Sequence, residues 1–260
     1  MNDIALELFA SEYARHRAQE GRGYSGEQLF QLPHLKTGPH IAQWAVRART
    51  FEAFMTCVLR PTAMKEGRAL AVLDLGAGNG WLSYRVALEG HHAFALDIRN
   101  DGVDGLGASA PFRRQAPGMD CIVAPFEAVP LPPGTIDIAL FNASLHYATN
   151  LRQVLCEAIR VTRRGGQIAI LDSPFYARES DGLAMVSEKR RQFGARAEVL
   201  MALPFIEFLT RRRLKDAAPE LAWKRHRVTY PLVYELRPFL AALKFKRRPS
   251  RFDLWIAAVP

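Results

Sequence analysis

The stretch from Leu70 to Leu82, LAVLDLGAGNGWL, constrains the fold more than any other part of the chain. It begins with an apolar run typical of a strand buried on both faces, and it ends in a segment with a helical pattern. Between the two, Gly76, Gly78 and Gly80 supply a turn, because glycine adopts backbone angles that other residues avoid and lets a ligand approach the backbone. The stretch therefore predicts a strand, a glycine turn and a helix whose first amides face an anionic group.

The spacing of the glycines argues against a dinucleotide site. The G-x-G-x-x-G fingerprint would need glycine at position 81, where this chain has Trp81. The chain reads D-x-G-x-G-x-G instead, with Asp74 two residues before the first glycine. An ordinary tight turn between a strand and a helix remains the alternative to a ligand site.

Strand and helix patterns alternate from this stretch to about residue 172. Apolar segments such as HAFALDI, ALFNA and QIAILDS are separated by helical segments such as VLCEAIRVT. Such alternation predicts an α/β fold with parallel strands and helices on both faces of the sheet. We also expect Gly165 and Gly166 to end the helix that precedes the fifth strand.

Helical patterns over residues 1–20 and 41–59 precede the sheet, and Pro61 is expected to end the second helix. Residues 1–67 are too few for an independent core, so we interpret them as a helical cap on a domain formed by residues 68–260. Within that domain, residues 175–202 have the pattern of a helical insertion, and Thr210 is the expected N-cap of a later helix.

Composition restricts the class of protein. With 260 residues, 49% of them hydrophobic, the chain can bury a full core. The first residues lack the features of a signal peptide and no apolar run approaches the roughly 18 residues that span a bilayer, so we expect a cytoplasmic protein without a transmembrane segment. The three cysteines form neither a CxxC pair nor a cluster with histidine, so neither a metal site nor a disulfide is expected.

The net charge of +9 is concentrated near the C-terminus. Residues 188–260 contain 17 Lys and Arg against 7 Asp and Glu. Such a block is compatible with a nucleic acid, an anionic lipid, an anionic substrate or a solvated surface. Arg211, Arg212 and Arg213, in the first turn of a predicted helix, oppose the helix dipole, and an anionic substrate would offset that conflict.

Several segments, taken in order, resemble a known family. They are the D-x-G-x-G-x-G pattern, Asp97 at the end of the second strand, the segment FEAVPLPPG and the pair Ile136-Asp137 at the fourth strand. They are similar to class I S-adenosylmethionine (SAM)-dependent methyltransferases, and most closely to the methyltransferase type 11 group. The resemblance covers about residues 68–172. It implies a Rossmann-like fold with a mostly parallel seven-stranded sheet, SAM as cofactor and S-adenosylhomocysteine as its product.

The resemblance also assigns roles at a cofactor site. The backbone of Gly76, Ala77 and Gly78 would lie beside the amino-acid end of SAM, and Asp74 would favour its ammonium group. Asp97 would hold both ribose hydroxyls, as the acid of dinucleotide folds does. The alternatives are a turn-stabilising role for Asp74 and a solvated position for Asp97.

Adenine and the methionine moiety would meet other residues. Ile98 would offer an apolar surface to adenine, and Asn142 at the end of the fourth strand would face the methionine moiety. The family commonly has an acid after the third strand, where this chain has Pro125. Adenine recognition would then depend on Phe126, on Glu127 or on shape.

The chemistry and the acceptor are less constrained by the sequence. His146 is the first candidate for a catalytic base, followed by His40, Asp172 and Tyr176, although His146 is equally compatible with a packed structural histidine. Tyr24, His40 and Trp44 in the cap, and Tyr176 in the insertion, are candidates for acceptor contacts through cation–π or polar interactions. Ordinary helix packing is the alternative for the cap residues.

Three functions remain open from the sequence. The first is methyl transfer to an O, N or C atom of a small molecule, which an anionic group on the acceptor would fit. No Asn-Pro-Pro-Tyr-like segment follows the fourth strand, which favours a small metabolite over the amino group of a base or amide. The second is methylation of RNA or another polyanion, suggested by the basic block and testable by salt-sensitive binding. The third is a SAM-binding scaffold without activity.

Overall fold

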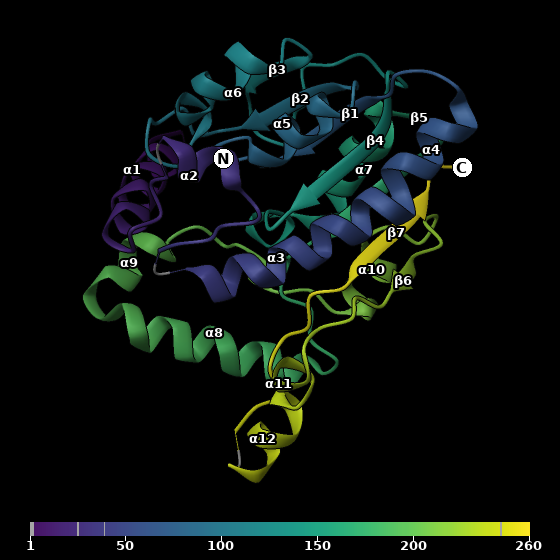
Figure 1. The fold of residues 1–260 in the computed structure, drawn as a ribbon. Helices are drawn as coiled ribbons and strands as arrows, with labels where there is room; N and C mark the ends of the chain where they lie inside the picture. The colour runs from purple at the N-terminus through teal and green to yellow at the C-terminus, as the bar shows by residue number, and fades with distance from the viewer. Residues whose placement is uncertain (1–2, 25, 39, 245) are drawn as a thin grey trace.

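A central sheet of seven strands organises the structure, a computed structural model that describes residues 3–24, 26–38, 40–244 and 246–260. The order across the sheet is β3-β2-β1-β4-β5-β7-β6 (Figure 1). The strands are β1 (Ala71–Leu75), β2 (His92–Asp97), β3 (Met119–Val123), β4 (Ile136–Asn142), β5 (Thr162–Leu171), β6 (Lys224–His226) and β7 (Leu254–Ala258). Strands β1 to β5 are parallel, and β7 runs antiparallel to β5 and β6. The predicted mostly parallel seven-stranded sheet is confirmed.

Helices connect and cover these strands. They are α1 (Asp3–Gln19), α2 (Glu27–Gln31), α3 (Ile41–Phe54), a π-helical turn η1 (Met55–Leu59), α4 (Arg60–Glu66), α5 (Trp81–Leu88), η2 (Leu106–Ser109), α6 (Ala110–Gln115), η3 (Leu145–Tyr147), α7 (Leu151–Val161), α8 (Glu179–Phe193), η4 (Gly194–Arg196), α9 (Ala197–Leu200), α10 (Arg211–Ala217), α11 (Leu232–Glu235) and α12 (Arg237–Leu243). Helices α8 and α9 occupy the segment predicted as an insertion.

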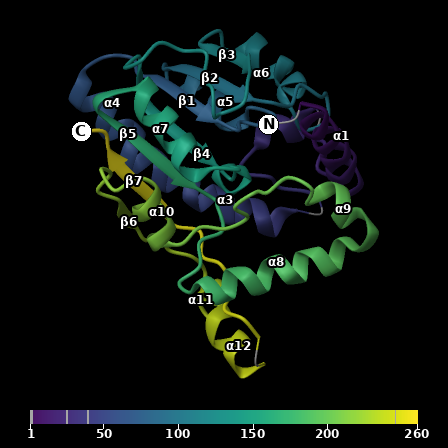
Figure 2. The ribbon, with the colours of Figure 1, turned by 180° about the vertical axis from the view of Figure 1, so that it is seen from behind.

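Both faces of the sheet are covered, as predicted. Ile138 and Leu140 of β4 pack with α3 and α5 on one face, while Phe141 packs with α7 and α10 on the other. The side chains alternate because successive residues of a strand point to opposite faces. Figure 1 shows the side with α3, and Figure 2 shows the side with α7 and α10.

The second predicted helix does not end at Pro61. Helix α3 runs into the π-helical turn and then into α4, so the helical backbone continues to Glu66. The amide of Arg60 already bonds five residues back, to the carbonyl of Met55. Pro61 follows directly in the first turn of α4, where the regular i to i−4 pattern that its missing amide would interrupt is already broken. Pro61 is therefore tolerated inside the long helix.

Two threonines attach this long helix to the neighbourhood of β5. Thr50 donates a hydrogen bond to Oδ1 of Asp172, just after β5, at 2.7 Å. Thr62 accepts one from the side-chain amide of Gln167 within β5, at 3.0 Å. The helix is therefore held at two points along the same strand.

The glycine pair before the fifth strand also differs from expectation. Helix α7 ends at Val161 and β5 begins at the next residue, so Gly165 and Gly166 lie within the strand. The register against β4 shifts there, and Gly165 has a φ of 74°. A Cβ on Gly166 would lie 2.8 Å from the carbonyl oxygen of Asp137. The glycines therefore serve a strand bulge, and the prediction of a helix C-cap is wrong.

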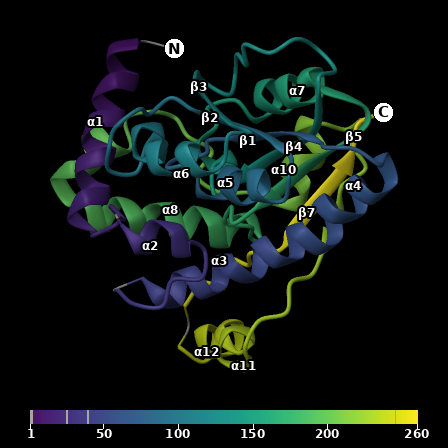
Figure 3. The same cartoon turned by 45° about the horizontal axis from the view of Figure 1, so that its top comes forward.

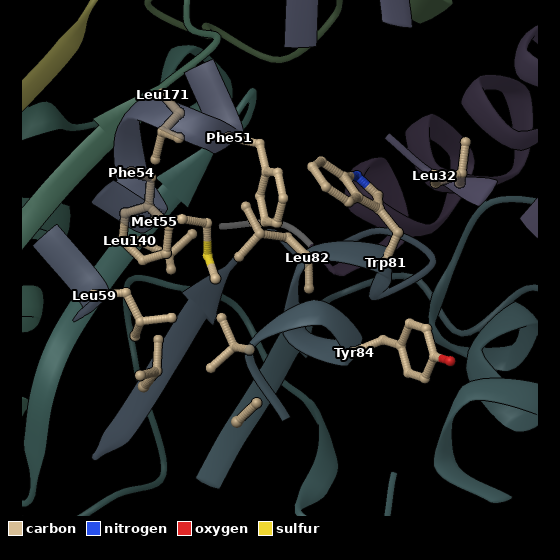
Figure 4. Packing of buried hydrophobic residues seen from close by; sticks show 14 of the residues in the cluster. Leu32, Phe51, Phe54, Met55, Leu59, Trp81, Leu82, Tyr84, Leu140 and Leu171 are labelled. Atoms are coloured by element: carbon tan, nitrogen blue, oxygen red, sulfur yellow. The ribbon is translucent and has the colours of Figure 1, made fainter. Parts of the chain in front are cut away.

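Residues of the N-terminal 67 share one hydrophobic core with the sheet. Trp44 and Phe51 of α3 pack on Trp81 of α5, with ring centroids 5.5 and 5.6 Å apart. Figure 4 shows Phe51 and Trp81 within this cluster. Helix α1 lies farther from it, beside α9. The segment predicted as a cap is thus packed directly on the sheet through α3.

The C-terminal part of the chain contributes the last strands of the sheet and also a segment that projects from it. Thr210 caps α10 as predicted, because its hydroxyl accepts from the Arg213 amide at 3.1 Å. Between β6 and β7 the chain projects from the body as α11 and α12 (Figure 3). Among the described residues, no helix is both long and apolar enough to cross a bilayer.

Candidate active site

The glycine turn between β1 and α5 is tightly packed. Gly76 and Gly80 have φ angles of 78° and 76°, which favour glycine, and a Cβ on Gly76 would lie 2.4 Å from the Cβ of Ser144. The amides of Gly76 and Ala77 both donate to the carbonyl oxygen of Leu96, at 2.8 and 2.9 Å. These bonds hold the turn against the end of β2; both amides precede the first amides of α5, where the sequence predicts a seat for an anionic group.

Asp97 and Asp74, the two predicted acids, lie on opposite sides of this turn. Asp97 accepts hydrogen bonds from the amides of Gly78, at 2.8 Å, and Arg99, at 2.9 Å, and its side chain lines a cavity beside the turn. Burial raises the pKa of Asp97. Asp74 lies behind the turn, outside the cavity lining, and accepts a hydrogen bond from Ser83 at 3.0 Å. Burial raises the pKa of Asp74 to about 7.

The cavity beside the turn, called the first cavity here, lies at the carboxyl ends of β1, β2 and β4. It holds about 980 Å³ of empty space, its open mouth included. Ile98, Pro125, Phe126 and Glu127 line one part of it, together with the predicted Gly76, Ala77 and Gly78. The buried Oδ1 of Asn142 also faces it and has no hydrogen-bond partner among the described residues. An unpartnered buried oxygen beside a backbone cradle fits a polar ligand.

Helix α1 supplies a wall of the first cavity that the sequence did not predict. Tyr13 and Arg17 line it, and the Tyr13 hydroxyl lies 2.9 Å from the hydroxyl of Tyr147. Arg17 forms an ion pair with Asp104 at 2.6 Å. The sequence signal for these contacts is limited to the helical pattern over residues 1–20, in which Tyr13 lies on the apolar side with Leu8 and Phe9.

A second cavity adjoins the first and holds about 1810 Å³ of empty space, its open mouth included. The two share five lining residues, Tyr13, Arg17, Arg47, Ala143 and Tyr147. The rest of the second lining comes from Arg22 after α1, from α3, from the loops after β4 and β5, and from the segment from Tyr230 to Phe252. The two ligand-sized spaces therefore adjoin at these five residues.

His146 lines the second cavity but is electrostatically unsuited to hold a proton. Its Nδ1 is buried and lacks a hydrogen-bond partner among the residues described. Burial, reinforced by the charges of Lys189 and Arg47, lowers its pKa to about 3. The imidazole is therefore neutral near pH 7, and it is a weak proton acceptor.

Asp172 lines the same cavity, and unlike His146 it is suited to accept a proton. Its Oδ1 accepts from Thr50 at 2.7 Å, and its Oδ2 lies 3.5 Å from Nε of Arg47 without a hydrogen bond among the described atoms. Burial raises the pKa of Asp172, and its φ of 50° is unusual for a residue other than glycine. A buried carboxylate with one unsatisfied oxygen accepts a proton more readily than an exposed one.

The four residues predicted to contact an acceptor are dispersed. Trp44 lines the first cavity, and its Nε1 donates to the hydroxyl of Tyr24 at 2.6 Å, which places Tyr24 behind it. The His40 Nε2 lies 2.6 Å from the carbonyl oxygen of Glu20, away from both linings. Tyr176 accepts from Arg247 at 3.2 Å, also outside both cavities. Of the four, the structure brings only Trp44 to the site.

Much of the basic C-terminal block is engaged in ion pairs. Arg213 pairs with Glu179 and donates to the carbonyls of Ile206 and Phe208, so it supports the chain locally. Further pairs join Arg225 to Asp253 and Arg247 to Glu188. These arginines do not form one open basic surface, which disfavours a polyanion as the partner.

Comparisons with known proteins agree with the fold. Residues 73–170 match a family model described as a methyltransferase domain. The chain is 31% identical over 146 residues to a malonyl-[acyl-carrier protein] O-methyltransferase of Erwinia pyrifoliae, covering 55% of this chain and 51% of that protein. It is 28% identical over 127 residues to a ubiquinone/menaquinone biosynthesis C-methyltransferase of Methylobacterium nodulans, covering 48% and 49%.

A solved structure matches along nearly the whole chain. It is the geranyl diphosphate C-methyltransferase of Streptomyces coelicolor, with a TM-score of 0.58, 13% identity, and coverage of 97% of this chain and 98% of that one. That likeness concerns the fold, whereas the matched sequence segments span about half the length of the curated relatives. Residues 73–170 thus form a methyltransferase domain, and the sheet has the Rossmann-like fold of the class I SAM-dependent methyltransferases.

Proposed function

We propose that the protein transfers the methyl group of SAM, held in the first cavity, to a small-molecule acceptor held in the second. The observation that carries this proposal is the part of the lining that the two cavities share, namely Tyr13, Arg17, Arg47, Ala143 and Tyr147. Methyl transfer requires two ligands to meet at one point, and holding them in line supplies roughly 7–11 kcal/mol of the barrier.

The residues of the first cavity match the parts of SAM. Asp97 has two oxygens, each with a lone pair beyond its backbone bond, for the ribose hydroxyls. Asn142 offers its unpartnered Oδ1 to the ammonium group of the methionine end. Ile98 and Phe126 provide apolar surfaces for adenine, beside Glu127, whose pKa is raised by burial. In this assignment Asp74 and Ser83 hold the glycine turn in place from behind.

Bound SAM supplies an electrophilic methyl group on a sulfonium. Tyr13 and Tyr147, joined through their hydroxyls, close α1 over the two cavities and exclude water from their junction. We assign proton acceptance to Asp172, because its pKa is raised and its Oδ2 has no hydrogen-bond partner among the described residues, whereas the pKa of His146 is lowered to about 3. An acceptor that is already an anion would need no base.

The second cavity favours an acceptor with an anionic group. Arg22, Arg47, Arg49 and Arg237 line it, and the buried Nε of Arg237 has no hydrogen-bond partner in the described part of the chain. The guanidinium donors suit a carboxylate or a phosphate. Two similar proteins are named for acceptors with such groups, malonyl-[acyl-carrier protein] and geranyl diphosphate. Charge and cavity size support the same class here.

Calorimetry of SAM binding tests the proposal. We expect SAM and S-adenosylhomocysteine to bind and NAD not to bind. Asp97→Ala removes two charge-assisted hydrogen bonds to the ligand, each worth about 1.5–3 kcal/mol, and should weaken SAM binding at least roughly tenfold. Asp120→Ala, at an exposed aspartate of β3, is the matched control. Equal SAM affinity in the two variants would refute the cofactor assignment. RNA binding in a filter assay would favour the polyanion alternative.

A further inference from the structure

The segment that projects from the body carries an unusual concentration of exposed apolar side chains. We call residues 232–244 and 246–248, which include α11 and α12, the protrusion. Six of the thirteen exposed large hydrophobic side chains of the described residues lie in it, namely Leu232, Val233, Leu236, Phe239, Leu240 and Leu243. Phe239 and Leu243 are each 62% exposed. Figures 1, 2 and 3 agree that α12 stands away from the sheet, while Figures 1 and 2 show α11 near the start of α8.

The apolar side chains follow a helical stripe. Leu232, Leu236, Leu240 and Leu243 recur at intervals of three or four residues, which places them along one side of a helix. Leu236 is helical and joins α11 to α12, so the stripe continues across both. A surface helix of a globular protein turns such a stripe toward its own core, whereas here it is exposed.

The charges of the protrusion are almost all positive. It contains Arg237, Lys244, Lys246, Arg247 and Arg248 and the single acid Glu235. Glu235 is neutralised by Arg251, at 2.8 and 2.9 Å, and by Arg227, at 3.1 Å. Lys244, Lys246 and Arg248 are exposed, and their side chains form no ion pair with any described residue. A partner that binds the protrusion must therefore offer both an apolar environment and negative charge.

The base of the protrusion is rigidly attached. Both terminal nitrogens of Arg251 donate hydrogen bonds to the Glu235 carboxylate, and the Tyr234 hydroxyl accepts one from the amide of Phe252 at 3.3 Å. The rings of Tyr230 and Tyr234 lie 4.0 Å apart between centroids. The exposed end is thus presented at a fixed angle.

We propose that the protrusion docks the protein on an anionic lipid surface. An amphipathic helix with apolar and cationic faces lies in the lipid interface, its apolar side chains among the acyl chains and its cations near anionic headgroups. An acidic protein would match the charges as well, but projecting apolar side chains would then need a complementary recess, which a lipid interface does not require.

The position of the protrusion links this surface to the acceptor site. Val233, Tyr234 and Arg237 belong to the protrusion and also line the second cavity. Docking would set that cavity beside the lipid, so an amphipathic anionic acceptor dissolved in the membrane would enter from this side. This last step rests on the proposed function, whereas docking itself does not.

Vesicle sedimentation with the full chain tests docking. Vesicles of phosphatidylcholine with about one third phosphatidylglycerol should bind the protein, and vesicles of phosphatidylcholine alone should bind it at least roughly tenfold less. Phe239→Ser with Leu243→Ser should weaken binding to anionic vesicles roughly tenfold or more. Lys244→Gln with Lys246→Gln and Arg248→Gln should remove most of the salt dependence.

Met64→Ser with Leu88→Ser is the matched control, because both are exposed apolar residues outside the protrusion. All variants change exposed side chains, and unchanged far-UV circular dichroism would confirm their folding. Equal sedimentation with neutral and anionic vesicles, or none with either, would overturn the proposal. The proposal would also be overturned if the wild type is a dimer, the Phe239→Ser and Leu243→Ser variant is a monomer, and no vesicle binding is detected. Since the assay contains no SAM, failed SAM binding with intact vesicle binding would refute the proposed function alone.

Discussion

The hydroxyl of Tyr13 in α1 lies 2.9 Å from the hydroxyl of Tyr147, which is 134 residues away and follows β4. Both tyrosines line both cavities, so this contact fastens α1 across the place where the two cavities meet. Burial raises the pKa of Tyr147, which keeps its hydroxyl protonated as a hydrogen-bond partner at neutral pH. Opening of α1 would break this contact and expose the site.

Tyr13→Phe tests whether this contact closes the site. Loss of one hydrogen bond costs about 0.5–1.5 kcal/mol, so we expect SAM to bind roughly two- to tenfold more weakly and α1 to be cleaved faster in limited proteolysis. Tyr84→Phe removes a comparable hydroxyl contact, to Gln115 at 2.9 Å, away from the cavities. Equal SAM affinity in the two variants would show that the tyrosine pair only stabilises the fold.

Gly76→Ala should disturb both the fold and the cofactor site. The alanine would carry left-handed backbone strain of about 1–2 kcal/mol and a Cβ overlap with Ser144 of about 1–3 kcal/mol. Gly90→Ala is the control, because Gly90 has a φ of 86° and no atom within 4 Å of an added Cβ. Chemical denaturation should show a larger loss in the free energy of unfolding for Gly76→Ala than for Gly90→Ala. Calorimetry should show a loss of SAM binding for Gly76→Ala only. Identical losses of stability would mean that crowding by Ser144 is absent.

Two buried groups should give opposite dependences of stability on pH. The pKa of His146 is lowered to about 3, so acidification below about pH 6.5 protonates the unfolded chain first and lowers the free energy of unfolding. The pKa of Asp74 is raised to about 7, so between about pH 4 and 7 the folded chain holds the extra proton, and acidification raises the free energy of unfolding.

The two variants that remove these groups separate the effects. Relative to wild type, His146→Gln should gain stability as the pH falls from about 6.5 to 4, and Asp74→Asn should lose it, each by up to about 1.4 kcal/mol per pH unit. Urea titrations at several pH values measure both. Parallel pH curves for wild type and a variant would show that the missing group does not titrate differently on folding.

The choice between Asp172 and His146 as proton acceptor is testable with an acceptor that must lose a proton. Asp172→Asn should lower kcat by roughly 10²–10⁴ and remove the acidic limb of the kcat–pH profile, with little change in SAM affinity. His146→Gln should lower kcat far less, because a group with a pKa near 3 accepts a proton poorly. The reverse ranking of the two variants would return the role to His146.

Arg237→Gln tests the anionic acceptor. Removal of the Arg237 Nε donor, which lacks a hydrogen-bond partner among the described residues, should raise KM for an anionic acceptor about tenfold and leave SAM affinity unchanged. Arg212→Gln, which removes an exposed arginine paired only with Asp216 among the described residues, is the control. A neutral acceptor turned over equally by both variants and wild type would argue against the anionic class.

The alternation of strands and helices and the place of the first cavity were accessible from the sequence because their signals are local. A buried strand, a glycine turn and an acid at the next strand end mark Gly76, Gly78 and Asp97 within 28 residues of Leu70. The second cavity was not accessible, because it forms only when α1, α3 and the segment around Tyr230 meet across more than 200 residues. Tyr176 shows the converse: its residue type suited a site, but packing turned its hydroxyl to Arg247.

The π-helical turn between α3 and α4 allows the long helix to be fastened twice to one strand. Thr50 and Thr62 are 12 residues apart, and at about 100° per residue a regular α-helix would turn them roughly 120° out of line. The widened turn absorbs about one residue, which reduces the misalignment to roughly 20°. Their partners Gln167 and Asp172 are about 17 Å apart along β5, close to the rise of the helix between the two threonines. Deleting one residue of Met55–Leu59 would rotate Trp44 and Arg47 by about 100° relative to the sheet. The length of this turn therefore determines which side chains of α3 face the cavities.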